Sequence, residues 1–217
     1  MENRESYLLD EVNAMNAHWP GNRTFNIVFH GHSVPAGYFA TPMIDSFHAY
    51  PHLVHVALKQ RFPFAVINAI VTAIGGEHTE AGAERFEAGV LNHKPDLLCI
   101  DYGLNDRLIG LEKAKTAWVS MIEKALARGI KVLLFTPTWD LPEYEARGKP
   151  TPLNAQTDQI RALAAAYPLG LVDSYKAFAE YLATGKDFQD LMSWSNHPNA
   201  RGHELVRDGI MGWFPLV

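Results

Sequence analysis

Three residues of this chain have side chains suited to acyl-transfer chemistry: Ser33, Asn105 and His197. A serine hydroxyl can attack a carbonyl carbon when a base such as histidine lies within hydrogen-bond reach. A side-chain amide can donate a hydrogen bond to the carbonyl oxygen while that oxygen becomes negative. The three residues are widely separated in the sequence, so they can act together only if the fold brings them to one place.

A fourth residue of interest is Gly76, in the loop 73–79 that follows an apolar stretch. A glycine there lets a backbone N–H approach an oxyanion closely. Each residue also has an ordinary alternative: Ser33 as a turn residue or helix N-cap, His197 as a surface or capping residue, and Gly76 as a loop glycine. The context 31–35 is not the Gly-x-Ser-x-Gly motif of α/β-hydrolases. The evidence therefore lies in the combination of the four residues.

Composition favours one globular domain over residues 1–217, because 47% of the residues are hydrophobic and 20% are charged. The net charge of −5 and the lack of a dense Lys/Arg tract argue against a nucleic-acid partner. The single cysteine, Cys99, excludes an internal disulfide framework and is expected to be buried filler. The polar N-terminus does not resemble a signal peptide, and no apolar run approaches a membrane span. We therefore expect a soluble, cytoplasmic protein without a membrane partner.

Five short apolar runs have the near-continuous hydrophobic character of strands that are buried on both faces of a parallel sheet. They are residues 25–30, 64–70, 97–102, 131–135 and 170–173. Six helical patterns alternate with them, beginning at 51, crossing 83–90 and 114–125, beginning at 151, crossing 178–182, and beginning near 198. This alternation predicts an α/β sandwich. Ligands bind such folds at the carboxyl ends of the strands, where Ser33 and Asn105 are expected.

Four segments of the chain resemble the sequence blocks of the SGNH (GDSL-type) hydrolases, which carry Ser, Gly, Asn and His in that order. The segments are Gly31-His32-Ser33-Val34-Pro35-Ala36-Gly37-Tyr38, then Gly76-Glu77-His78-Thr79 with Gly82 and Arg85-Phe86, then Gly103-Leu104-Asn105-Asp106, and finally His197-Pro198-Asn199. The third and last segments are the most specific. The resemblance spans residues 25–210, nearly the whole chain.

The resemblance implies a role for each of the four residues. Ser33 would be the nucleophile and His197 the general base. The backbone N–H groups of Ser33 and Gly76, with the side chain of Asn105, would form an oxyanion hole. The implied fold is a three-layer, flavodoxin-like α/β/α sandwich with a five-stranded parallel sheet. The implied reaction needs no cofactor and no metal.

Two positions depart from the family pattern. The family usually has Asp where this chain has His32, and Asp three residues before the catalytic histidine, where this chain has Trp194. The second Asp fixes the histidine tautomer in a catalytic triad. We therefore expect a Ser-His dyad with another orienting group. A backbone carbonyl could serve, and Ser193, Ser195 and Asp190 are alternatives that the sequence does not rank.

The sequence predicts a serine esterase that acts on small acyl esters, with acetyl groups on a carbohydrate as the favoured substrate. Trp139 and Trp194 are expected as substrate contacts because an indole can stack on a sugar ring. For Trp139 the alternative is packing beneath the loop through residues 149–150. His32 could also contact substrate, although a structural role is an equal alternative. The oligomeric state does not follow from the sequence.

Three other functions fit parts of the sequence. A thioesterase or lysophospholipase would use the same site on longer acyl chains. A non-catalytic carbohydrate-binding relic would account for Trp194 in place of Asp. A flavodoxin-like nucleotide-binding module would fit the fold class, but residues 75–77 are too short and too acidic for a phosphate-binding loop.

Overall fold

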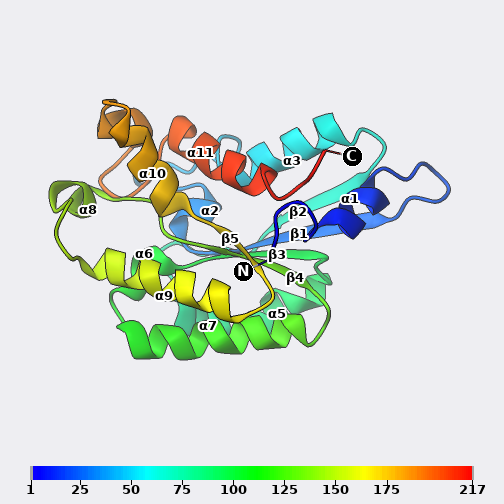
Figure 1. Ribbon diagram of the computed structural model, residues 1–217, viewed down its shortest axis with the longest axis horizontal. Coiled ribbons are helices and arrows are strands. Elements are labelled where there is room, and N and C mark those ends of the chain that lie inside the picture. The colour runs from blue at the N-terminus through cyan, green and yellow to red at the C-terminus, as the bar shows by residue number, and fades with distance from the viewer. Residues whose placement is uncertain (1, 217) are drawn as a thin grey trace.

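Five parallel strands form one sheet at the centre of the molecule, in the order β2-β1-β3-β4-β5 (Figure 1). The computed structural model describes residues 2–216. The strands are β1 (Thr24–Gly31), β2 (Val66–Val71), β3 (Leu97–Asp101), β4 (Lys131–Phe135) and β5 (Gly170–Val172). This strand order is the flavodoxin-like one. All five predicted strands are present, and β4 has the predicted bounds.

The strands that are buried on both faces have the most continuous apolar sequences. All five residues of β3 are buried, as are four of the five in β4, because helices cover both faces of the sheet there. In contrast, β2 is an edge strand whose residues Val66 and Val71 are exposed. The predicted range for this strand, 64–70, starts two residues early and ends one residue early. A half-exposed strand gives a weaker hydrophobic pattern, so its bounds are harder to predict.

Helices cover the two faces of the sheet, which confirms the three-layer α/β/α sandwich (Figure 1). One face packs against α1 (Leu9–Met15), α3 (Tyr50–Arg61) and α11 (Ala200–Met211). The other face packs against α4 (Thr79–Glu84), α5 (Phe86–Gly89), η1 (Leu91–His93), α7 (Leu111–Leu126) and α9 (Pro152–Ala166). A third apolar cluster joins α8 (Leu141–Glu145), α10 (Ser174–Ala183) and η2 (Phe188–Leu191).

Local signals fix where the longer helices begin and end. The Thr151 hydroxyl accepts a hydrogen bond from the backbone N–H of Asn154 at 2.9 Å and caps the start of α9. The side chain of Asn199 caps α11 in the same way. Gly129, with φ of +70°, follows the end of α7. Sequence patterns predicted all three helices.

The single helix predicted across 83–90 is two short helices, α4 and α5, separated at Arg85. Four other short helices were not predicted, because a helix of two turns or less shows too little periodicity. They are α1, α8, α2 (Ser33–Ala36) and α6 (Gly103–Asp106). Two of them, α2 and α6, directly follow the carboxyl ends of β1 and β3, the neighbouring strands at the middle of the sheet. Among residues 2–216, no helix has the length and apolar character that crossing a membrane requires.

Close approach of the backbones brings the ends of β1 and β3 together. Gly31, the last residue of β1, pairs with Asp101, the last residue of β3. A Cβ atom at Gly31 would collide with the Asp101 carbonyl oxygen, so glycine alone fits there. The backbone N–H of His32 then donates to that carbonyl at 3.2 Å. The segments that carry Ser33 and Asn105 therefore leave the sheet side by side.

Candidate active site

Ser33 and His197 meet although 164 residues separate them. Ser33 is the first residue of α2, and its side chain is buried at the carboxyl edge of the sheet. Its hydroxyl oxygen lies 3.0 Å from Nε2 of His197, which comes from the loop before α11. Gly37, with φ of +88°, ends α2 and turns the chain sharply. The contact has the length expected for a nucleophile and its base.

The other ring nitrogen of His197 is held by a backbone carbonyl. Nδ1 lies 2.8 Å from the carbonyl oxygen of Phe39, and the Thr41 hydroxyl is 3.5 Å away. A carbonyl oxygen can only accept a hydrogen bond, so Nδ1 carries the ring proton and Nε2 keeps its lone pair for the Ser33 hydroxyl. This is the tautomer that a general base needs.

Burial lowers the pKa of His197 below the ordinary histidine value. The hydrogen bond to the Phe39 carbonyl opposes this shift, and the nearby His32 adds to it. The ring is therefore neutral, and able to accept a proton, at lower pH than an exposed histidine.

A short hairpin, residues 37–45, presents the Phe39 carbonyl. The backbone N–H of Phe39 donates to the Met43 carbonyl at 3.0 Å, and that of Asp45 donates to the Gly37 carbonyl at 2.7 Å. The Phe39 ring stacks on the buried His203, with 5.2 Å between ring centroids. Bonds along the hairpin and packing beneath it thus fix the carbonyl that orients His197.

Within residues 2–216, none of the three side chains considered as orienting groups is hydrogen-bonded to the ring of His197. The Ser193 hydroxyl donates to the backbone carbonyl of His197 at 3.1 Å rather than to its ring. Asp190 accepts from the Tyr181 hydroxyl at 3.2 Å. Ser195 accepts a hydrogen bond from the Leu141 N–H through its backbone carbonyl, at 2.6 Å. The backbone-carbonyl alternative is the one present, but no sequence signal could have identified Phe39, because a main-chain acceptor has no side-chain signature.

Gly76 lies in a tight turn after β2. The turn closes through the N–H of Glu77, which donates to the Ile74 carbonyl at 3.2 Å, and the Ile74 N–H in turn donates to the Gly31 carbonyl at 3.0 Å. The φ of +78° at Gly76 is readily adopted only by glycine. Within residues 2–216, neither the N–H of Gly76 nor that of Ser33 has a protein acceptor. Both donors are therefore available to a bound group.

Asn105 belongs to α6, after β3, and its side-chain amide is held in a defined orientation. Nδ2 donates to the carbonyl oxygen of Glu77 at 2.9 Å. An amide nitrogen has two hydrogens, so one stays available for a ligand. The next residue, Asp106, is fully buried and accepts from the Thr79 N–H and hydroxyl, both at 2.8 Å, and from the Trp118 indole at 2.8 Å. These bonds tie the Asn105 segment to α4 and α7.

The structure thus brings Ser33, Gly76, Asn105 and His197 to one edge of the sheet. Ser33 follows β1, Gly76 follows β2 and Asn105 follows β3, which are three neighbouring strands with β1 in the middle. The hydrogen bonds just described connect the three strand ends to one another and His197 to Ser33.

His32 occupies a buried position beneath Ser33. Its Nδ1 accepts from the Val34 N–H at 3.2 Å and caps α2, so Nε2 carries the proton, 3.5 Å from the Asp101 carboxylate. Asp101 also accepts from the Tyr50 hydroxyl at 3.1 Å. With 1% of its surface exposed, His32 supports the loop and presents no open face for a substrate.

The two tryptophans expected near a substrate differ in exposure. Trp139 is 7% exposed and packs against Tyr175, at 5.2 Å between ring centroids, in the cluster of α8, α10 and η2. Trp194 is 54% exposed. Of the two indoles, Trp194 is therefore the one that a ligand can reach from solvent.

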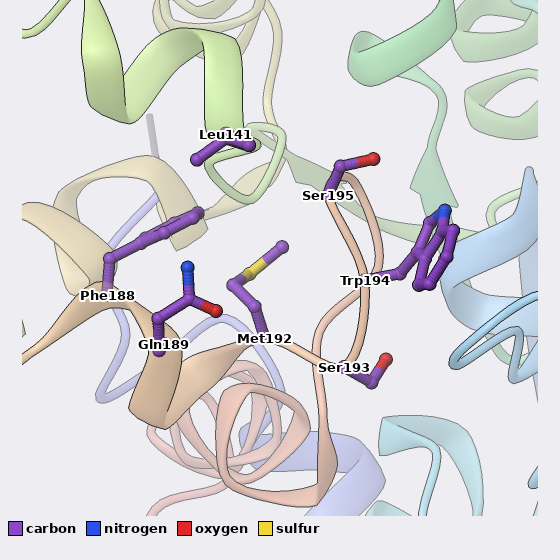
Figure 2. Close-up of a pocket in the computed structure, with 7 residues that line it drawn as sticks. All are labelled: Leu141, Phe188, Gln189, Met192, Ser193, Trp194 and Ser195. Atoms are coloured by element: carbon purple, nitrogen blue, oxygen red, sulfur yellow. The ribbon is translucent and has the colours of Figure 1, made fainter.

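A pocket of about 350 Å³ lies beside the loop that carries His197. Figure 2 shows Leu141, Phe188, Gln189 and Met192 facing one another across it, whereas the indole of Trp194 points away from them on the far side of the loop. The pocket therefore has apolar walls with one amide, and Ser193 and Ser195 also line it. Sequence reasoning did not identify it, because its walls combine Leu141 with the distant segment 188–195.

Comparison with known proteins identifies relatives of the chain. The model of the GDSL-like Lipase/Acylhydrolase family matches residues 29–205. The uncharacterized lipoprotein YqeF of Bacillus subtilis (strain 168) is 27% identical over 177 residues, which cover 67% of this chain and 71% of that protein. The family match contains all four residues of the candidate site.

Several solved structures share the fold. A two-domain esterase active on acetylated mannans superposes with a TM-score of 0.74 at 24% identity over 96% of this chain, which spans about half (52%) of that esterase. Axe2, an acetylxylan esterase from Geobacillus stearothermophilus, gives 0.76 at 19% identity over 89% of this chain and 95% of its own. The acetyl xylan esterase AlAXEase gives 0.71 at 24% identity, over 86% and 98%.

Proposed function

The chain belongs to the GDSL-like Lipase/Acylhydrolase family and is a carboxylic ester hydrolase, and we propose that it removes acetyl groups from a carbohydrate through an acyl-enzyme on Ser33. The observation that carries the proposal is the arrangement at His197. Nε2 lies 3.0 Å from the Ser33 hydroxyl while Nδ1 is held at 2.8 Å by the Phe39 carbonyl. A nucleophile, a base and an orienting group stand in line.

In the first half of the reaction, the Ser33 hydroxyl oxygen attacks the ester carbonyl carbon and its proton moves to Nε2 of His197. The carbonyl oxygen becomes an oxyanion and accepts hydrogen bonds from the N–H groups of Ser33 and Gly76 and from the Asn105 amide. Such preorganised donors each lower the barrier by about 3 kcal/mol. The C–O bond to the alcohol then breaks, the alcohol leaves with the proton from Nε2, and acetyl-Ser33 remains.

In the second half, a water molecule takes the place of the alcohol. His197 accepts a proton from this water, whose oxygen attacks the acetyl carbon. The same hole holds the second oxyanion. The bond to Ser33 then breaks, Nε2 returns the proton to the serine oxygen, and acetate is released.

Two observations support an acetylated carbohydrate as the substrate. The structural neighbours at TM-scores of 0.71 to 0.76 include esterases described as active on acetylated mannans and acetyl xylan. The indole of Trp194 is 54% exposed and stands three residues before His197, where a sugar ring could stack on it. The pocket beside this loop adds a second surface for the alcohol part of the substrate.

The test compares ester hydrolysis by the wild type, by Ser33→Ala and by a matched control, Ser120→Ala. The control removes a serine from α7, outside the candidate site. Substrates are p-nitrophenyl esters of increasing acyl length, and acetylated xylo- and manno-oligosaccharides followed by acetate release. We expect Ser33→Ala to lose all activity, Ser120→Ala to retain it, and acetyl esters to be the best substrates.

Each contrary outcome has a distinct meaning. Equal hydrolysis by wild type and Ser33→Ala would reject Ser33 as the nucleophile. Faster hydrolysis of long acyl chains than of acetyl would reject the acetyl preference and favour a thioesterase or lysophospholipase. Binding of an acetylated oligosaccharide without acetate release would favour a non-catalytic binding protein.

A further inference from the structure

We propose that Glu77 is a positioning residue that locks two donors of the oxyanion hole, Gly76 and Asn105, in place. The proposal rests on the proposed function, because it assigns Glu77 a role through that hole. Glu77 touches both donors with its main chain, and its side chain is anchored from the opposite direction. No part of Glu77 contacts the Ser33 or His197 side chain among the hydrogen bonds of residues 2–216.

The main chain of Glu77 makes one bond toward each donor. Its N–H donates to the Ile74 carbonyl at 3.2 Å and closes the turn that presents the Gly76 N–H. Its carbonyl accepts from Nδ2 of Asn105 at 2.9 Å. A shift of Glu77 would therefore open the turn and release the Asn105 amide at the same time.

The bond to Asn105 also decides how the amide is presented. A free asparagine side chain can rotate about its terminal torsion, which is broad and roughly two-fold. The Glu77 carbonyl engages one of the two Nδ2 hydrogens, so the nitrogen stays on this side and the second hydrogen keeps one direction. Preorganised donors are effective because they need no reorientation as the oxyanion forms.

The Glu77 carboxylate is clamped in turn. Arg85, at the end of α4, donates from Nε to one carboxylate oxygen at 2.7 Å and from its terminal nitrogen to the other. The Tyr102 hydroxyl, just after β3, donates to that second oxygen at 2.5 Å. The Glu77 side chain is 7% exposed. A two-point arginine bond and a phenol thus fix a nearly buried carboxylate.

The charge on this carboxylate is stable at neutral pH. Burial raises the pKa of Glu77, but the hydrogen bonds from Arg85 and Tyr102 lower it by more, so the pKa falls below the ordinary glutamate value. The clamp therefore holds under the conditions in which His197 acts as a base.

The Tyr102 hydroxyl, which donates to Glu77, is itself held by a hydrogen-bonded pair formed by His30 and Thr72. Nε2 of His30, in β1, lies 3.1 Å from the Tyr102 hydroxyl, and its Nδ1 lies 3.0 Å from the Thr72 hydroxyl, just past β2. A Cβ atom at Gly82 would collide with the Tyr102 ring, so the glycine leaves room for the phenol. The network therefore links β1, the end of β2, β3 and α4 behind the hole.

The test uses Glu77→Gln, which keeps the shape of the side chain but replaces one of its two accepting oxygens with an NH₂ group. Arg85 donates to both oxygens of the carboxylate, so either orientation of the carboxamide sets the NH₂ group against an Arg85 donor, and we expect the clamp to loosen. Misplacement of a reacting or stabilising group by about 1 Å can cost about 100-fold in rate. We expect kcat for p-nitrophenyl acetate to fall about ten- to 100-fold, with KM nearly unchanged. Tyr102→Phe, which removes one bond of the clamp, should give a smaller fall in the same parameter.

The matched control is Asp96→Asn. Asp96 also pairs with an arginine, Arg23, at 2.6 Å, but at the amino ends of the strands, the opposite edge of the sheet. This change should leave kcat unaltered while lowering thermal stability. A fall in thermal stability for Glu77→Gln without a fall in kcat would mean that Glu77 is merely structural and would overturn the proposal.

A double-mutant cycle with Asn105→Ala tests whether Glu77 acts through the hole. Loss of one oxyanion donor lowers kcat by about 100- to 1,000-fold. If Glu77 acts by positioning that donor, Glu77→Gln should have much less effect in the Asn105→Ala background than in the wild type. Equal effects in the two backgrounds would show that Glu77 does not act through Asn105.

A measurement independent of activity keeps the proposal separate from the proposed function. In ¹⁵N-labelled protein, the Asn105 side-chain proton bonded to Glu77 should exchange slowly with solvent. The exchange should become about tenfold or more faster in Glu77→Gln and stay unchanged in Asp96→Asn, as expected for loss of one hydrogen bond. Were Ser33→Ala to leave hydrolysis unchanged, the proposed nucleophile would fail, yet this exchange rate would still decide whether Glu77 positions Asn105.

Discussion

Replacing Trp194 with aspartate tests whether the Phe39 carbonyl orients His197. Position 194 is where the wider family carries the triad Asp, and the Trp194 side chain is 54% exposed, so the change removes no core packing. We expect Trp194→Asp to raise kcat/KM by no more than about tenfold, the gain that a charged acceptor offers over a neutral one. A histidine that lacked any orienting group would gain far more.

The magnitude follows from the bond that is already present. In serine proteases, changing the triad Asp to Asn lowers kcat about 10⁴-fold because the histidine is held in the wrong tautomer. That part of the loss does not apply here, because the Phe39 carbonyl already accepts from Nδ1 at 2.8 Å. A carboxylate would add only charge. A hydrogen bond to a charged group contributes about 1.5–3 kcal/mol and a neutral one about 0.5–1.5, a difference of about tenfold in rate.

The assay is p-nitrophenyl acetate hydrolysis by the wild type, Trp194→Asp, Trp194→Asn and Trp194→Ala across a pH series. The alanine variant measures the loss of the indole alone, and the asparagine variant separates charge from shape. If the carboxylate reaches Nδ1, it should also raise the pKa of His197 in the aspartate variant. A gain of about 1,000-fold or more in Trp194→Asp alone would refute the view that His197 is already oriented.

Two further predictions concern protons. The acid limb of the wild-type kcat/KM profile should have its midpoint below 6.5, because burial lowers the pKa of His197 and the base stays neutral at lower pH; a midpoint at or above 6.5 would contradict this. The free energy of unfolding should fall as the pH drops from about 6.5 towards 4. Burial lowers the pKa of His30 to about 4 in the folded protein. The unfolded chain takes up this proton near 6.5, so acid favours the unfolded state. The difference between the two pKa values corresponds to a loss of about 3 kcal/mol by pH 4. Urea unfolding of the wild type and of His30→Gln at pH 6.5 and pH 4 measures this loss. The free energy of unfolding should depend less on pH in the variant.

The fold could be predicted because its central strands are covered on both faces. The run 131–135 is apolar after Lys131 and bounded by turn signals, and it is β4 with the same bounds. The run 64–70 was predicted less accurately because β2 is an edge strand with half of its surface open. Helices with caps and long apolar stripes, such as α7, were predicted well. The seven-residue α1 and the five-residue α8 are too short for a periodic pattern.

The candidate site could be predicted only as far as it consists of side chains that belong to recognisable segments. Ser33, Asn105 and His197 lie in such segments, and the rule that parallel strands end at one edge places the first two together. The Phe39 carbonyl could not be found in this way, because any residue supplies a carbonyl and only the folded hairpin 37–45 aims this one at His197. The sequence showed that Trp194 stands in place of the usual triad Asp, but it could not show that the Phe39 carbonyl orients His197 instead.

The contacts of Glu77 could not be predicted from the sequence either. Its sequence neighbourhood shows an acidic residue and, eight positions later, Arg85, a separation longer than the three or four residues at which side chains of one helix pair directly. Glu77 precedes α4 and Arg85 follows its last residue, so the Arg85 side chain reaches back along this short helix to the carboxylate. The contact to Asn105 depends on the order of β2, β1 and β3, which is a property of the sheet rather than of any segment.

A neutral orienting group has a consequence for the rest of the proposed site. In the proposed mechanism, burial keeps His197 neutral, which favours its action as a base, and the uncharged Phe39 carbonyl that orients the ring opposes this shift only in part. The same features stabilise the imidazolium less than a carboxylate would, so more of the transition-state stabilisation must come from the oxyanion side. Gly76 lies in a loop and Asn105 in a helix of four residues, and such short connecting segments move unless they are anchored. A clamp that fixes Glu77, and through it Gly76 and Asn105, is therefore the support that a dyad without its aspartate most needs.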